Sequence, residues 1–558
     1  MTNENTAAFR AARDLLLDLR EDHDAAYERF RWPRFEQFNW ALDWFDAIAR
    51  DNDRDALRLI DGDGKGSVGV TYAELAQRSD RVANWLRSLG VRRGTRMITM
   101  LENQAELWET VLAGMKLGAV IIPTYTTVSP SDLADRIGRG GVTHLVTTAE
   151  AALRIGRAHA NLTRVAAGAD VPGWHRYSDA AAESPEFTPD GPTRADDLLF
   201  LYFTSGTTAR PKQVAHTHVS YPVGHLSGMY LNGVRPGDRH LNISAPGWAK
   251  HVWSSFFVPF NAEATLLAVN ADHGAPRLIL DTLSRHRATT FCAPPTAWRM
   301  LVQEDLRAWP VSLREAVSVG EPLNPEVIEQ VRTAWGVTVR DGYGQTETTA
   351  QIGNTPGLPI RPGSMGKALP GYRITLVDPL TGAAADEGEI CVDLSDRPVG
   401  VMAGYVDDGD RNAATFAGGL YHTGDLGRLD ADGHLTCVGR MDDVFKSFDH
   451  RISPFELESV LLEHPDVAEA AVVPAPGPVS TLVPKAYVTL VAGREPTDTA
   501  AASILAHARD RLAPHQWIRS LEFGSLPKTT SGKIRRAELR VASAAAGITA
   551  APDAVEGR

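Results

Sequence analysis

Helical and strand-like patterns of apolar residues alternate along much of the chain. In the segment from Thr71 to Val91, four apolar side chains fall on one helical face: Leu75, Val82, Leu86 and Leu89. Thr71 and Glu74 have the spacing of a capping box, which predicts that a helix begins here. The stretch RMITML that follows predicts a buried strand, and AELWETVLAGMKLGAVIIPTY predicts another helix and strand.

The same alternation recurs in four later stretches: THLVTT, DLLFLYFTSG, ATLLAVN and TTFCAPP. Such alternation predicts α/β layers around a largely parallel sheet. Further on, the pattern changes to a β-rich run with glycines at the expected turns: Gly382, Gly388, Gly404, Gly424 and Gly433. Because a small α/β unit follows, a boundary is predicted near Asp442. We therefore predict an α/β fold with a large N-terminal domain of layered sheets and helices, a β-rich subdomain and a small α+β C-terminal domain.

Composition narrows the class of protein. A chain of 558 residues is too long for one ordinary core, so two or more domains are expected. Its 43% hydrophobic and 23% charged residues are ordinary for a soluble enzyme. The formal net charge of -12 provides no general basic field, which disfavours nucleic-acid binding.

The cysteines and the apolar segments indicate in which cellular compartment the protein is located. Cys292, Cys391 and Cys437 are far apart and odd in number, which favours reduced core residues over a disulfide framework or a metal site. The charged N-terminus lacks the apolar run of an export signal. The most membrane-like segment, VLAGMKLGAVIIP, is short and interrupted by Lys116, which favours a buried helix-to-strand passage. We therefore predict a cytoplasmic protein without membrane insertion.

The stretch YFTSGTTARPKQVAHTH, which begins at Tyr202, is the first candidate for chemistry. It fails the Walker pattern because Gly206 is followed by Pro211, Lys212 and Gln213, without the second glycine or the magnesium-binding hydroxyl. A loop rich in Ser, Thr and Gly after an apolar strand still provides N–H and hydroxyl groups for phosphate oxygens, and Lys212 adds a positive charge. Taken alone, the loop is also compatible with a polar surface turn.

Three further segments have side chains suited to a nucleotide. DGYGQTETT, from Asp341, combines close-approach glycines, hydroxyls and one carboxylate, which suits an α-phosphate and Mg²⁺. In YHTGDLGRLDADGHLTCVGRMDD, Asp425 offers two acceptors for ribose hydroxyls, and Arg440 is a second ribose or phosphate donor. LPKTTSGKIRRAEL presents Lys533 before a basic helix start. Taken alone, each segment also has an ordinary structural explanation. The first is compatible with a strand-end turn, the second with a hairpin that carries a solvated ion pair, and the third with an exposed lysine.

Taken together, in this order and at these separations, the motifs resemble the adenylate-forming superfamily. That superfamily includes acyl-CoA synthetases, firefly luciferase and peptide-synthetase adenylation domains, and the resemblance covers nearly the whole chain. The segments FNWALDWFD, GWAKHVWSS and SVGEPLNPEV look most like the medium-chain acyl-CoA synthetase branch. The resemblance therefore implies an acid-thiol ligase that converts a carboxylic acid to its CoA thioester through an acyl-AMP intermediate.

The resemblance also implies a role for each residue of the nucleotide site. The cradle for the β,γ-phosphates of ATP would comprise Thr204, Ser205, Gly206, Thr207, Thr208 and Lys212. Thr346 and Glu347 would hold the α-phosphate and Mg²⁺. The adenine site would include Gly320, Glu321, Pro322, Asp341, Gly342 and Tyr343. Asp425 and Arg440 would bind ribose, and Lys533 would stabilise charge as the acyl oxygen displaces pyrophosphate.

Similar enzymes rotate a mobile C-terminal domain between the two steps, and Asp442 matches their hinge. This implies an N-terminal domain over residues 1–440, a hinge at 441–442, a lid domain over 443–540 and a flexible tail over 541–558. In the second pose Lys533 would leave, and the CoA thiol would enter a tunnel lined by Lys446, Phe448, Asp449 and Arg451. The acyl pocket would include Trp248, as an aromatic gate, with His251 and Val252. Ordinary core packing is the alternative for these three.

The chain departs from the family pattern at two places. Relatives normally have glycine where this chain has Ala209, which is followed by the bulky Arg210. A methyl group is unfavourable where glycine adopts a positive φ or lets the backbone approach a ligand. In the tunnel segment KSFDHRI, Phe448, Asp449 and His450 replace the usual Ser-Gly-Tyr. Aspartate tolerates left-handed conformations better than most residues, so Asp449 is expected to keep the turn more readily than Ala209 keeps its loop.

We therefore expect a soluble two-domain acyl-CoA synthetase that uses ATP, Mg²⁺ and CoA. Two alternatives stay open because of the departures. One is an enzyme with impaired adenylation that mainly transfers preformed acyl-AMP to CoA. The other is a non-catalytic nucleotide or acyl-AMP binding protein. Expected partners are the carboxylic acid, ATP and CoA, with a homo-oligomer and a separate adenylating enzyme as further alternatives.

Overall fold

The computed structural model describes residues 3–204, 211–270, 275–321, 323–361, 363–447, 450–477, 482–491, 493–528 and 534–545. The chain divides into two compact units. The first unit comprises Met1–Arg373 and Asp393–Tyr421, and the second comprises Ile374–Val392 and His422–Arg558. In this division residues 374–392, which directly follow Arg373, belong to the same unit as the C-terminal residues. The predicted domain boundary near Asp442 stays a prediction.

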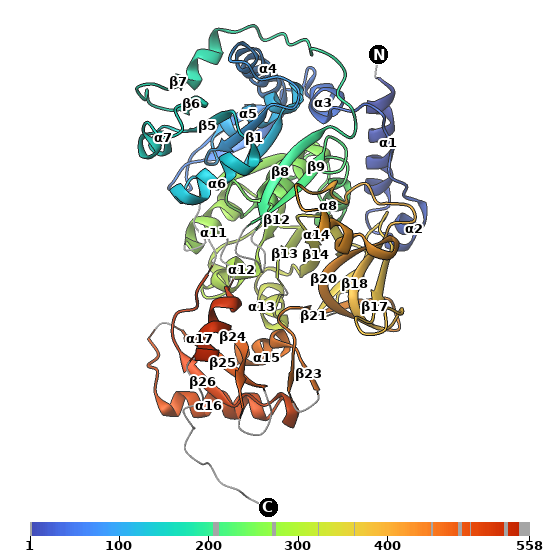
Figure 1. The fold of residues 1–558 in the computed structure, drawn as a ribbon, viewed down its shortest axis with the longest axis vertical. Coiled ribbons are helices and arrows are strands. Elements are labelled where there is room, and N and C mark those ends of the chain that lie inside the picture. The colour runs from blue at the N-terminus through green and yellow to red at the C-terminus, as the bar shows by residue number, and fades with distance from the viewer. Residues whose placement is uncertain are drawn as a thin grey trace, which may run out of the picture. The chain divides into compact units, whose positions relative to one another are not determined.

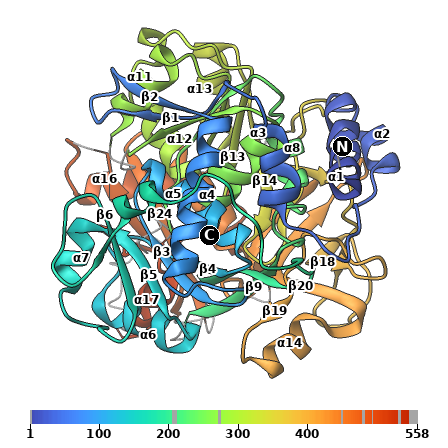
Figure 2. The ribbon, with the colours of Figure 1, turned by 90° about the horizontal axis from the view of Figure 1, so that it is seen from above.

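One sheet of the first unit has the strand order β19-β9-β8-β4-β3-β5-β6-β7. Figure 1 labels its strands β5 to β9. Its strands are β3 (Arg96–Met100), β4 (Val120–Pro123), β5 (His144–Thr148), β6 (Thr163–Ala167), β7 (His175–Arg176), β8 (Leu198–Thr204), β9 (Lys212–Thr217) and β19 (Gly404–Tyr405). The pairs from β8 to β7 are parallel, whereas β9 pairs antiparallel with β8 and β19. Helix α5 (Ala105–Lys116) packs against β3 and β4, and α7 (Ala149–Ile155) packs against β5 and β6 (Figure 2).

A second sheet of the first unit has the order β16-β15-β14-β13-β12-β10-β11-β1-β2. Its strands are β1 (Asp55–Ile60), β2 (Ser67–Thr71), β10 (Arg239–Asn242), β11 (Thr265–Val269), β12 (Thr290–Ala293), β13 (Glu315–Val319), β14 (Val339–Gln345), β15 (Thr349–Gly353) and β16 (Ser364–Ala368). The pairs from β14 to β1 are parallel, and β15 and β2 pair antiparallel with their neighbours. The predicted α/β alternation around parallel strands is thus confirmed.

Helices cover both sheets of the first unit. They include α1 (Glu4–Asp18), α2 (His23–Arg29), α3 (Asp46–Ala49), α4 (Tyr72–Ser88), α6 (Pro130–Gly140), α8 (His225–Asn232), α9 (Ala249–Val252), α10 (Val258–Asn261), α11 (Pro276–Arg285), α12 (Pro295–Leu301), α13 (Pro325–Trp335) and α14 (Gly409–Thr415). Short π or 3₁₀ segments are η1 (Ala41–Phe45), η2 (Tyr177–Ala182), η3 (Trp253–Phe257), η4 (Leu306–Ala308) and η5 (Ala417–Gly419). Side chains from α11, α12 and α13 pack on the second sheet around the buried Trp298.

The second unit contains two small sheets in addition to its first strands. The first strands are β17 (Ile374–Val377), β18 (Glu387–Asp393), β20 (Leu420–Leu429) and β21 (Leu435–Arg440), in the order β17-β18-β20-β21. They are followed by the hairpin β22 (Phe445–Ser447) and β23 (His450–Ile452), and by the sheet β24 (Val467–Pro476), β25 (Leu482–Leu490) and β26 (Ser520–Phe523). The helices are α15 (Pro454–Leu462), α16 (Asp498–Arg509), η6 (Pro514–Gln516) and α17 (Arg536–Ala545). An apolar core around Leu457, Val472 and Ile504 joins α15, the sheet and α16.

The start of α4 illustrates how local sequence positions these helices. The Thr71 hydroxyl accepts from the Glu74 N–H at 3.1 Å, and the Glu74 carboxylate accepts from the Thr71 N–H at 2.9 Å. Both bonds satisfy N–H groups that a helix start otherwise leaves unpaired. Leu75, Val82 and Leu86 are buried. The predicted capping box is therefore confirmed, and so is the apolar face except at Leu89, which is the C-cap residue after α4 and only partly buried.

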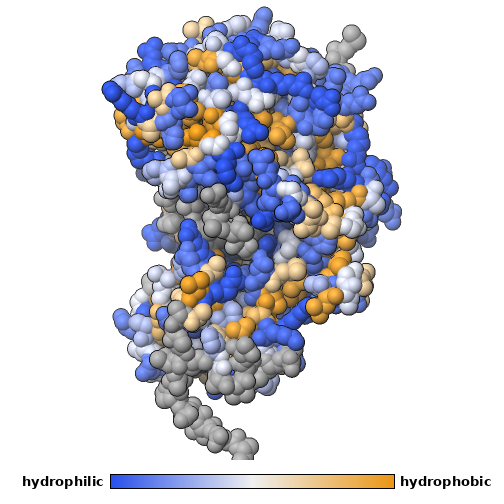
Figure 3. Space-filling view, in the orientation of Figure 1, coloured by the Kyte–Doolittle hydropathy of each residue, from blue (hydrophilic) through white to orange (hydrophobic). Residues whose placement is uncertain are grey.

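Lys116 lies at the end of α5, where the chain passes into β4. Its side chain is fully buried, and Nζ lies 2.8 Å from Asp46 Oδ1 and 2.6 Å from Asp80 Oδ1. Burial raises the pKa of Asp46 to about 6, even though Lys116 lowers it. The predicted passage from a buried helix to a strand is confirmed. Among the described residues, no helix has the length and apolar character that crossing a bilayer requires. The face drawn in Figure 3 is mostly hydrophilic, with smaller hydrophobic groups between.

We expect Lys116→Met to lower the free energy of unfolding by about 3 kcal/mol, because two partly buried carboxylates lose their shared cation. The measurement is urea unfolding at neutral pH. Lys65→Met is the matched control, because Lys65 pairs with Asp63 on the surface, where both side chains are exposed. Equal stability of the two variants would contradict the structural role assigned to Lys116.

Candidate active site

The ends of the predicted phosphate loop are held by an antiparallel strand pair. Thr204, the last residue of β8, is the register partner of Lys212, the first residue of β9. Arg139 of α6 donates to the Pro211 carbonyl at 2.9 Å and so fixes the chain just before Lys212. Six predicted loop residues lie outside the described residues: Ser205, Gly206, Thr207, Thr208, Ala209 and Arg210. The pairing therefore places the two ends of the loop side by side.

Tyr405 joins the predicted phosphate lysine to the predicted metal carboxylate. The Lys212 Nζ lies 5.3 Å from the centroid of the Tyr405 ring, and the Tyr405 hydroxyl donates to Glu347 Oε1 at 2.9 Å. Strand β19 brings Tyr405 opposite Val214 of β9. The Met402 N–H also donates to the Glu347 carbonyl, at 2.7 Å. A cation and a carboxylate from distant segments are thus brought to one aromatic side chain, which the sequence did not predict.

Thr346 and Glu347 lie in the turn between β14 and β15. These strands pair antiparallel, with Gln345 opposite Thr349. A Cβ at Gly344 would lie 2.1 Å from the Thr349 carbonyl oxygen, so only glycine fits where the two strands approach. The Tyr421 hydroxyl donates to Gln345 Oε1 at 2.7 Å. The turn is therefore held by the strand pairing of β14 and β15 and by the hydrogen bond from Tyr421.

A buried histidine holds the backbone of Thr346. His216 Nε2 lies 2.7 Å from the Thr346 carbonyl oxygen, and Nδ1 lies 2.9 Å from the Ser220 hydroxyl. Burial lowers the pKa of His216 to about 4, so the ring is neutral at physiological pH. Because a carbonyl only accepts, Nε2 carries the proton and Nδ1 accepts from Ser220. The neutral ring therefore fixes the turn that carries Glu347 without adding a charge.

The predicted adenine residues follow the carboxyl end of β13 and lie beside it within β14. Ser318 is the register partner of Asp341, and Gly320 and Glu321 follow directly after β13. Carboxyl ends of adjacent parallel strands are where α/β sheets bind ligands. Glu321 also pairs with Arg299, at 3.7 Å. The structure thus brings these residues to one edge of the sheet, while Pro322 lies outside the described residues.

Asp341 is a buried carboxyl at this edge. It accepts from the Gly342 N–H at 2.9 Å and from the Leu323 N–H at 3.3 Å. Burial raises its pKa to about 8, although the two N–H donors lower it. Next to it, a Cβ at Gly342 would lie 2.6 Å from a methyl group of Leu231, so the glycine serves packing within the protein. Tyr343 follows in β14, opposite Ile352.

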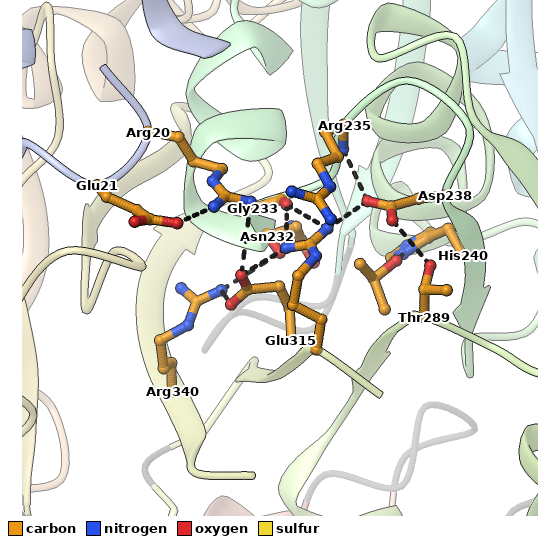
Figure 4. A network of polar contacts seen from close by, with 12 residues as sticks. Arg20, Glu21, Asn232, Gly233, Arg235, Asp238, His240, Thr289, Glu315 and Arg340 are labelled. Carbon is orange, nitrogen blue, oxygen red and sulfur yellow. Dashed lines mark hydrogen bonds and ion pairs between the residues drawn. The ribbon is translucent and has the colours of Figure 1, made fainter. Parts of the chain in front are cut away.

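A network of buried charges anchors the other end of these two strands (Figure 4). Glu315 begins β13, and its Oε2 lies 2.8 Å from Arg340 of β14. Its Oε1 lies 2.6 Å from Arg314, which also pairs with Asp238. Arg340 donates to the Asn354 carbonyl at 2.6 Å. Each charge thus has a partner of opposite sign, and the starts of β13 and β14 are tied together.

The predicted acyl-pocket residues lie around a helix that contains a π segment. Trp248 stacks on Tyr125, with ring centroids 5.1 Å apart and planes at 7°. His251 is buried, and its Nε2 lies 2.8 Å from Asn103 Oδ1. Burial lowers the pKa of His251 to about 3, so the ring is neutral. Val252 is also buried. The structure brings the three together, and it adds Tyr125, for which the sequence carried no signal.

In the second unit, the predicted ribose residues face one another across a strand pair. Asp425 of β20 is the register partner of Arg440 of β21, and Arg440 Nη1 donates to Asp425 Oδ1 at 3.0 Å. The Asp425 side chain is buried, whereas that of Arg440 is partly exposed. The hydrogen bond thus orients one carboxylate oxygen of Asp425.

The predicted hinge and tunnel residues follow β21. The Asp442 carbonyl accepts from Arg540 of α17 at 2.8 Å, and Arg540 also pairs with Asp443 at 2.6 Å. Lys446 and Arg451 are register partners in the hairpin of β22 and β23. Phe448, Asp449 and Lys533 lie outside the described residues. Arg540 therefore connects the hinge segment to the helix that follows the predicted catalytic lysine in the sequence.

Comparison with known proteins identifies the family. Residues 44–406 match the AMP-binding enzyme family, and residues 456–533 match the AMP-binding enzyme C-terminal domain. The chain therefore belongs to the AMP-binding enzyme family. As predicted, it is an acyl-CoA synthetase of the adenylate-forming class, a ligase that forms a CoA thioester through acyl-AMP.

Individual relatives agree with this class. The chain is 40% identical to 4-hydroxybutyrate–CoA ligase 1 of Metallosphaera sedula over 514 residues, which cover 90% of each chain. It is 37% identical to the mitochondrial acyl-coenzyme A synthetase ACSM3 of Rattus norvegicus over 533 residues, again 90% of each. Among solved structures, the anthranilate CoA ligase AuaEII in complex with anthranoyl-AMP superposes with a TM-score of 0.83 at 28% identity, covering 92% of this chain and 98% of the other. A benzoate CoA ligase from Burkholderia xenovorans superposes with a TM-score of 0.78 at 27% identity, covering 90% of this chain and 100% of the other. The predicted α/β fold class is thereby confirmed.

We expect Asp341→Asn to remove a pH dependence of stability. The folded-state pKa of about 8 lies above the ordinary aspartate pKa of 3.8, so the unfolded chain releases this proton first as pH rises. Wild-type stability should therefore fall relative to the variant as pH rises from about 4 to 8, and the difference should level off above that value. Urea unfolding of both proteins between pH 5 and 9 measures this. A difference that is constant with pH would contradict the raised pKa.

Proposed function

We propose that this synthetase runs both half-reactions with the residues its sequence predicted. The observation that carries the proposal is the arrangement of Lys212 and Glu347 around Tyr405, because it combines a phosphate-binding cation with a metal-binding carboxylate. In the first half-reaction, Lys212 and the loop from Thr204 hold the β,γ-phosphates of ATP. The Thr346 hydroxyl donates to an α-phosphate oxygen. Charge that develops on the phosphates is then stabilised by groups already in position.

Glu347 fits a magnesium ion. Mg²⁺ is usually held by one or two carboxylates together with phosphate oxygens and water. The Tyr405 hydroxyl occupies Oε1 of Glu347, which orients Oε2 for a metal. When bound, Mg²⁺ neutralises phosphate charge, and Glu347 supplies its protein ligand.

Asp425, Arg440 and the adenine residues bind the nucleoside. Arg440 orients Asp425 through Oδ1, and a carboxylate is the acceptor that the ribose hydroxyls require. Gly320, Glu321, Asp341, Gly342 and Tyr343 form the adenine edge, together with Pro322. Lys533 stabilises charge on the acyl carboxylate and the α-phosphate in the first step only. Asp442 is the hinge, and CoA then enters along Lys446, Phe448, Asp449 and Arg451.

We further propose that the acid is a monocarboxylic acid of short or medium size. The names of three similar proteins specify 4-hydroxybutyrate, anthranilate and benzoate, which are acids in this range. Trp248, His251 and Val252 line the acyl pocket in this proposal. The two buried residues among them, His251 and Val252, are uncharged. A cytoplasmic location and a homo-oligomer remain part of the proposal, although several relatives, among them that of Rattus norvegicus, are named as mitochondrial.

A second candidate function rests on Ala209. A methyl group where relatives carry glycine is expected to displace the triphosphate but not acyl-AMP, which lacks the β,γ-phosphates. In that case the chain would mainly transfer preformed acyl-AMP to CoA, and a separate adenylating enzyme would supply the intermediate. The two candidates differ in the rate of the first half-reaction.

Lys533→Ala should abolish most acyl-AMP formation and leave CoA transfer from synthetic acyl-AMP nearly intact. The physical reason is that the lysine contacts charge that exists only in the first transition state. The measurements are pyrophosphate release with an acid identified by mass-spectrometric screening, and thioester formation from the matching acyl-AMP.

Lys528→Ala is the matched control for Lys533→Ala. Lys528 lies five residues earlier and pairs with Glu469 at 2.5 Å. Its substitution should leave both half-reactions within about twofold of wild type. Equal loss of the two half-reactions in Lys533→Ala would remove Lys533 from the proposed role.

Ala209→Gly should raise the rate of ATP-dependent adenylation selectively. If the methyl group displaces the β,γ-phosphates by about 1 Å, positioning alone costs on the order of a hundredfold. Thiolysis of supplied acyl-AMP should not change, because that ligand lacks both phosphates. Arg210→Ala, alone and combined with Ala209→Gly, tests the effect of the neighbouring side chain. If the wild type releases pyrophosphate as fast as Ala209→Gly does, the methyl group has no cost and the complete two-step enzyme is favoured.

A further inference from the structure

Three side chains of different chemistry converge on β18 and β20 of the second unit. Glu389 and Cys391 alternate along β18 and therefore point to the same face of the sheet. His422 lies on the neighbouring strand β20. Their ligand atoms, a carboxylate oxygen, a thiol sulfur and an imidazole nitrogen, all lie within 4.8 Å of one another. Strands hold them, so the arrangement does not depend on a loop.

The two groups on β18 share one nitrogen of His422. Nδ1 lies 2.7 Å from Glu389 Oε2 and 3.5 Å from Cys391 Sγ. A ring nitrogen has one proton or one lone pair in the ring plane, so it makes one strong hydrogen bond. The sulfur therefore lies beside a nitrogen that is already engaged with the carboxylate. A positive ion in place of the shared proton would satisfy all three groups together.

We propose that Glu389, Cys391 and His422 form a binding site for a thiophilic divalent cation of the zinc type. Sulfur, imidazole nitrogen and carboxylate oxygen are the ligands that Zn²⁺ takes in proteins. Tetrahedral zinc with sulfur at about 2.3 Å and nitrogen at about 2.0 Å sets those two donors about 3.5 Å apart. The observed separation of Sγ and Nδ1 is 3.5 Å. Three protein ligands leave a fourth position for water, and His422 is partly exposed to solvent.

Only the carboxylate has to move. A tetrahedral site needs the nitrogen and oxygen about 3.3 Å apart, whereas Nδ1 and Oε2 are 2.7 Å apart, as in a hydrogen bond. A small rotation of the Glu389 side chain supplies the difference. Burial, together with Glu389, raises the pKa of the Cys391 thiol to about 12, so the free thiol is protonated and the metal displaces that proton. Cys391 is thus a free, buried cysteine, as the sequence predicted, but one whose neighbours suit a metal, which the sequence did not predict.

The site connects to the proposed ribose residue through Glu389. Its Oε1 accepts from the Gly424 N–H at 2.9 Å, and Gly424 directly precedes Asp425. A metal that draws Glu389 away from this position would change the backbone that carries Asp425. We therefore expect metal binding to weaken AMP binding. This coupling rests on the proposed role of Asp425, whereas the metal site does not.

The test of the metal site is titration of the full chain with Co²⁺, whose tetrahedral thiolate complexes absorb in the near ultraviolet and the visible. We expect one Co²⁺ per chain, with a thiolate charge-transfer band that Zn²⁺ abolishes by displacement. Cys391→Ala should lose the band, and His422→Gln should weaken Co²⁺ binding at least about tenfold. Cys437→Ala, at the other cysteine of this unit, should keep the band. Circular dichroism verifies that each variant is folded.

No charge-transfer band in the wild type, or an equal band in Cys391→Ala, would overturn the metal site. The coupling is measured separately by calorimetric titration of AMP with and without Zn²⁺. A Zn²⁺-dependent loss of AMP affinity in the wild type but not in Cys391→Ala supports the coupling. Unchanged AMP affinity in a wild type that shows the band would reject the coupling and leave the metal site established.

Discussion

The position of the proposed nucleotide edge depends on charges buried at the opposite end of the same strands. Glu315 begins β13 and contacts Arg340 of β14 and the neighbouring Arg314. Burying such charges is costly, and removing one partner would leave the others uncompensated. A shift of β14 along β13 would separate Arg340 from Glu315 and would also turn its side chains to the other face of the sheet. The register with Ser318 opposite Asp341 is therefore constrained, and with it the place where both strands end.

Strand register also brings together the other groups of the site. Tyr405 reaches Lys212 because β19 pairs with β9, and Asp425 meets Arg440 because β20 pairs with β21. In each case strand pairing fixes the backbone positions from which the two side chains of the proposed site extend. The turn with Glu347 is held in the same way by the hairpin of β14 and β15. The proposed site is thus built mainly from strand ends and turns, and helices such as α12 and α13 pack against the sheet.

Local signals made much of this predictable from sequence. The capping box at Thr71, the alternation of helices and parallel strands, and the order of the motifs each depend on residues close together in the chain. Tyr405 was missed because its contacts with Lys212 and Glu347 require pairing between segments far apart in sequence. Tyr125 under Trp248 and the group of Glu389, Cys391 and His422 were missed for the same reason. A cysteine in a strand pattern looks like any small apolar residue until its neighbours across the sheet are known.

A glycine in a motif can be required for one of two reasons: packing within the protein, or close approach of a ligand. The sequence alone does not distinguish the two. At Gly344 a Cβ would meet the backbone carbonyl of Thr349, so glycine is needed there, whereas at Gly342 it would meet only the end of the Leu231 side chain. Both contacts lie within the protein, so packing alone is one reason for a glycine in such a motif. A glycine that the fold requires could not become alanine without moving the backbone beside it. The resemblance to the family implies a glycine at the position of Ala209, and we expect the methyl group there to act on the triphosphate. The cost of the methyl group is then expected in adenylation, whereas acyl-AMP, which lacks the β,γ-phosphates, escapes it.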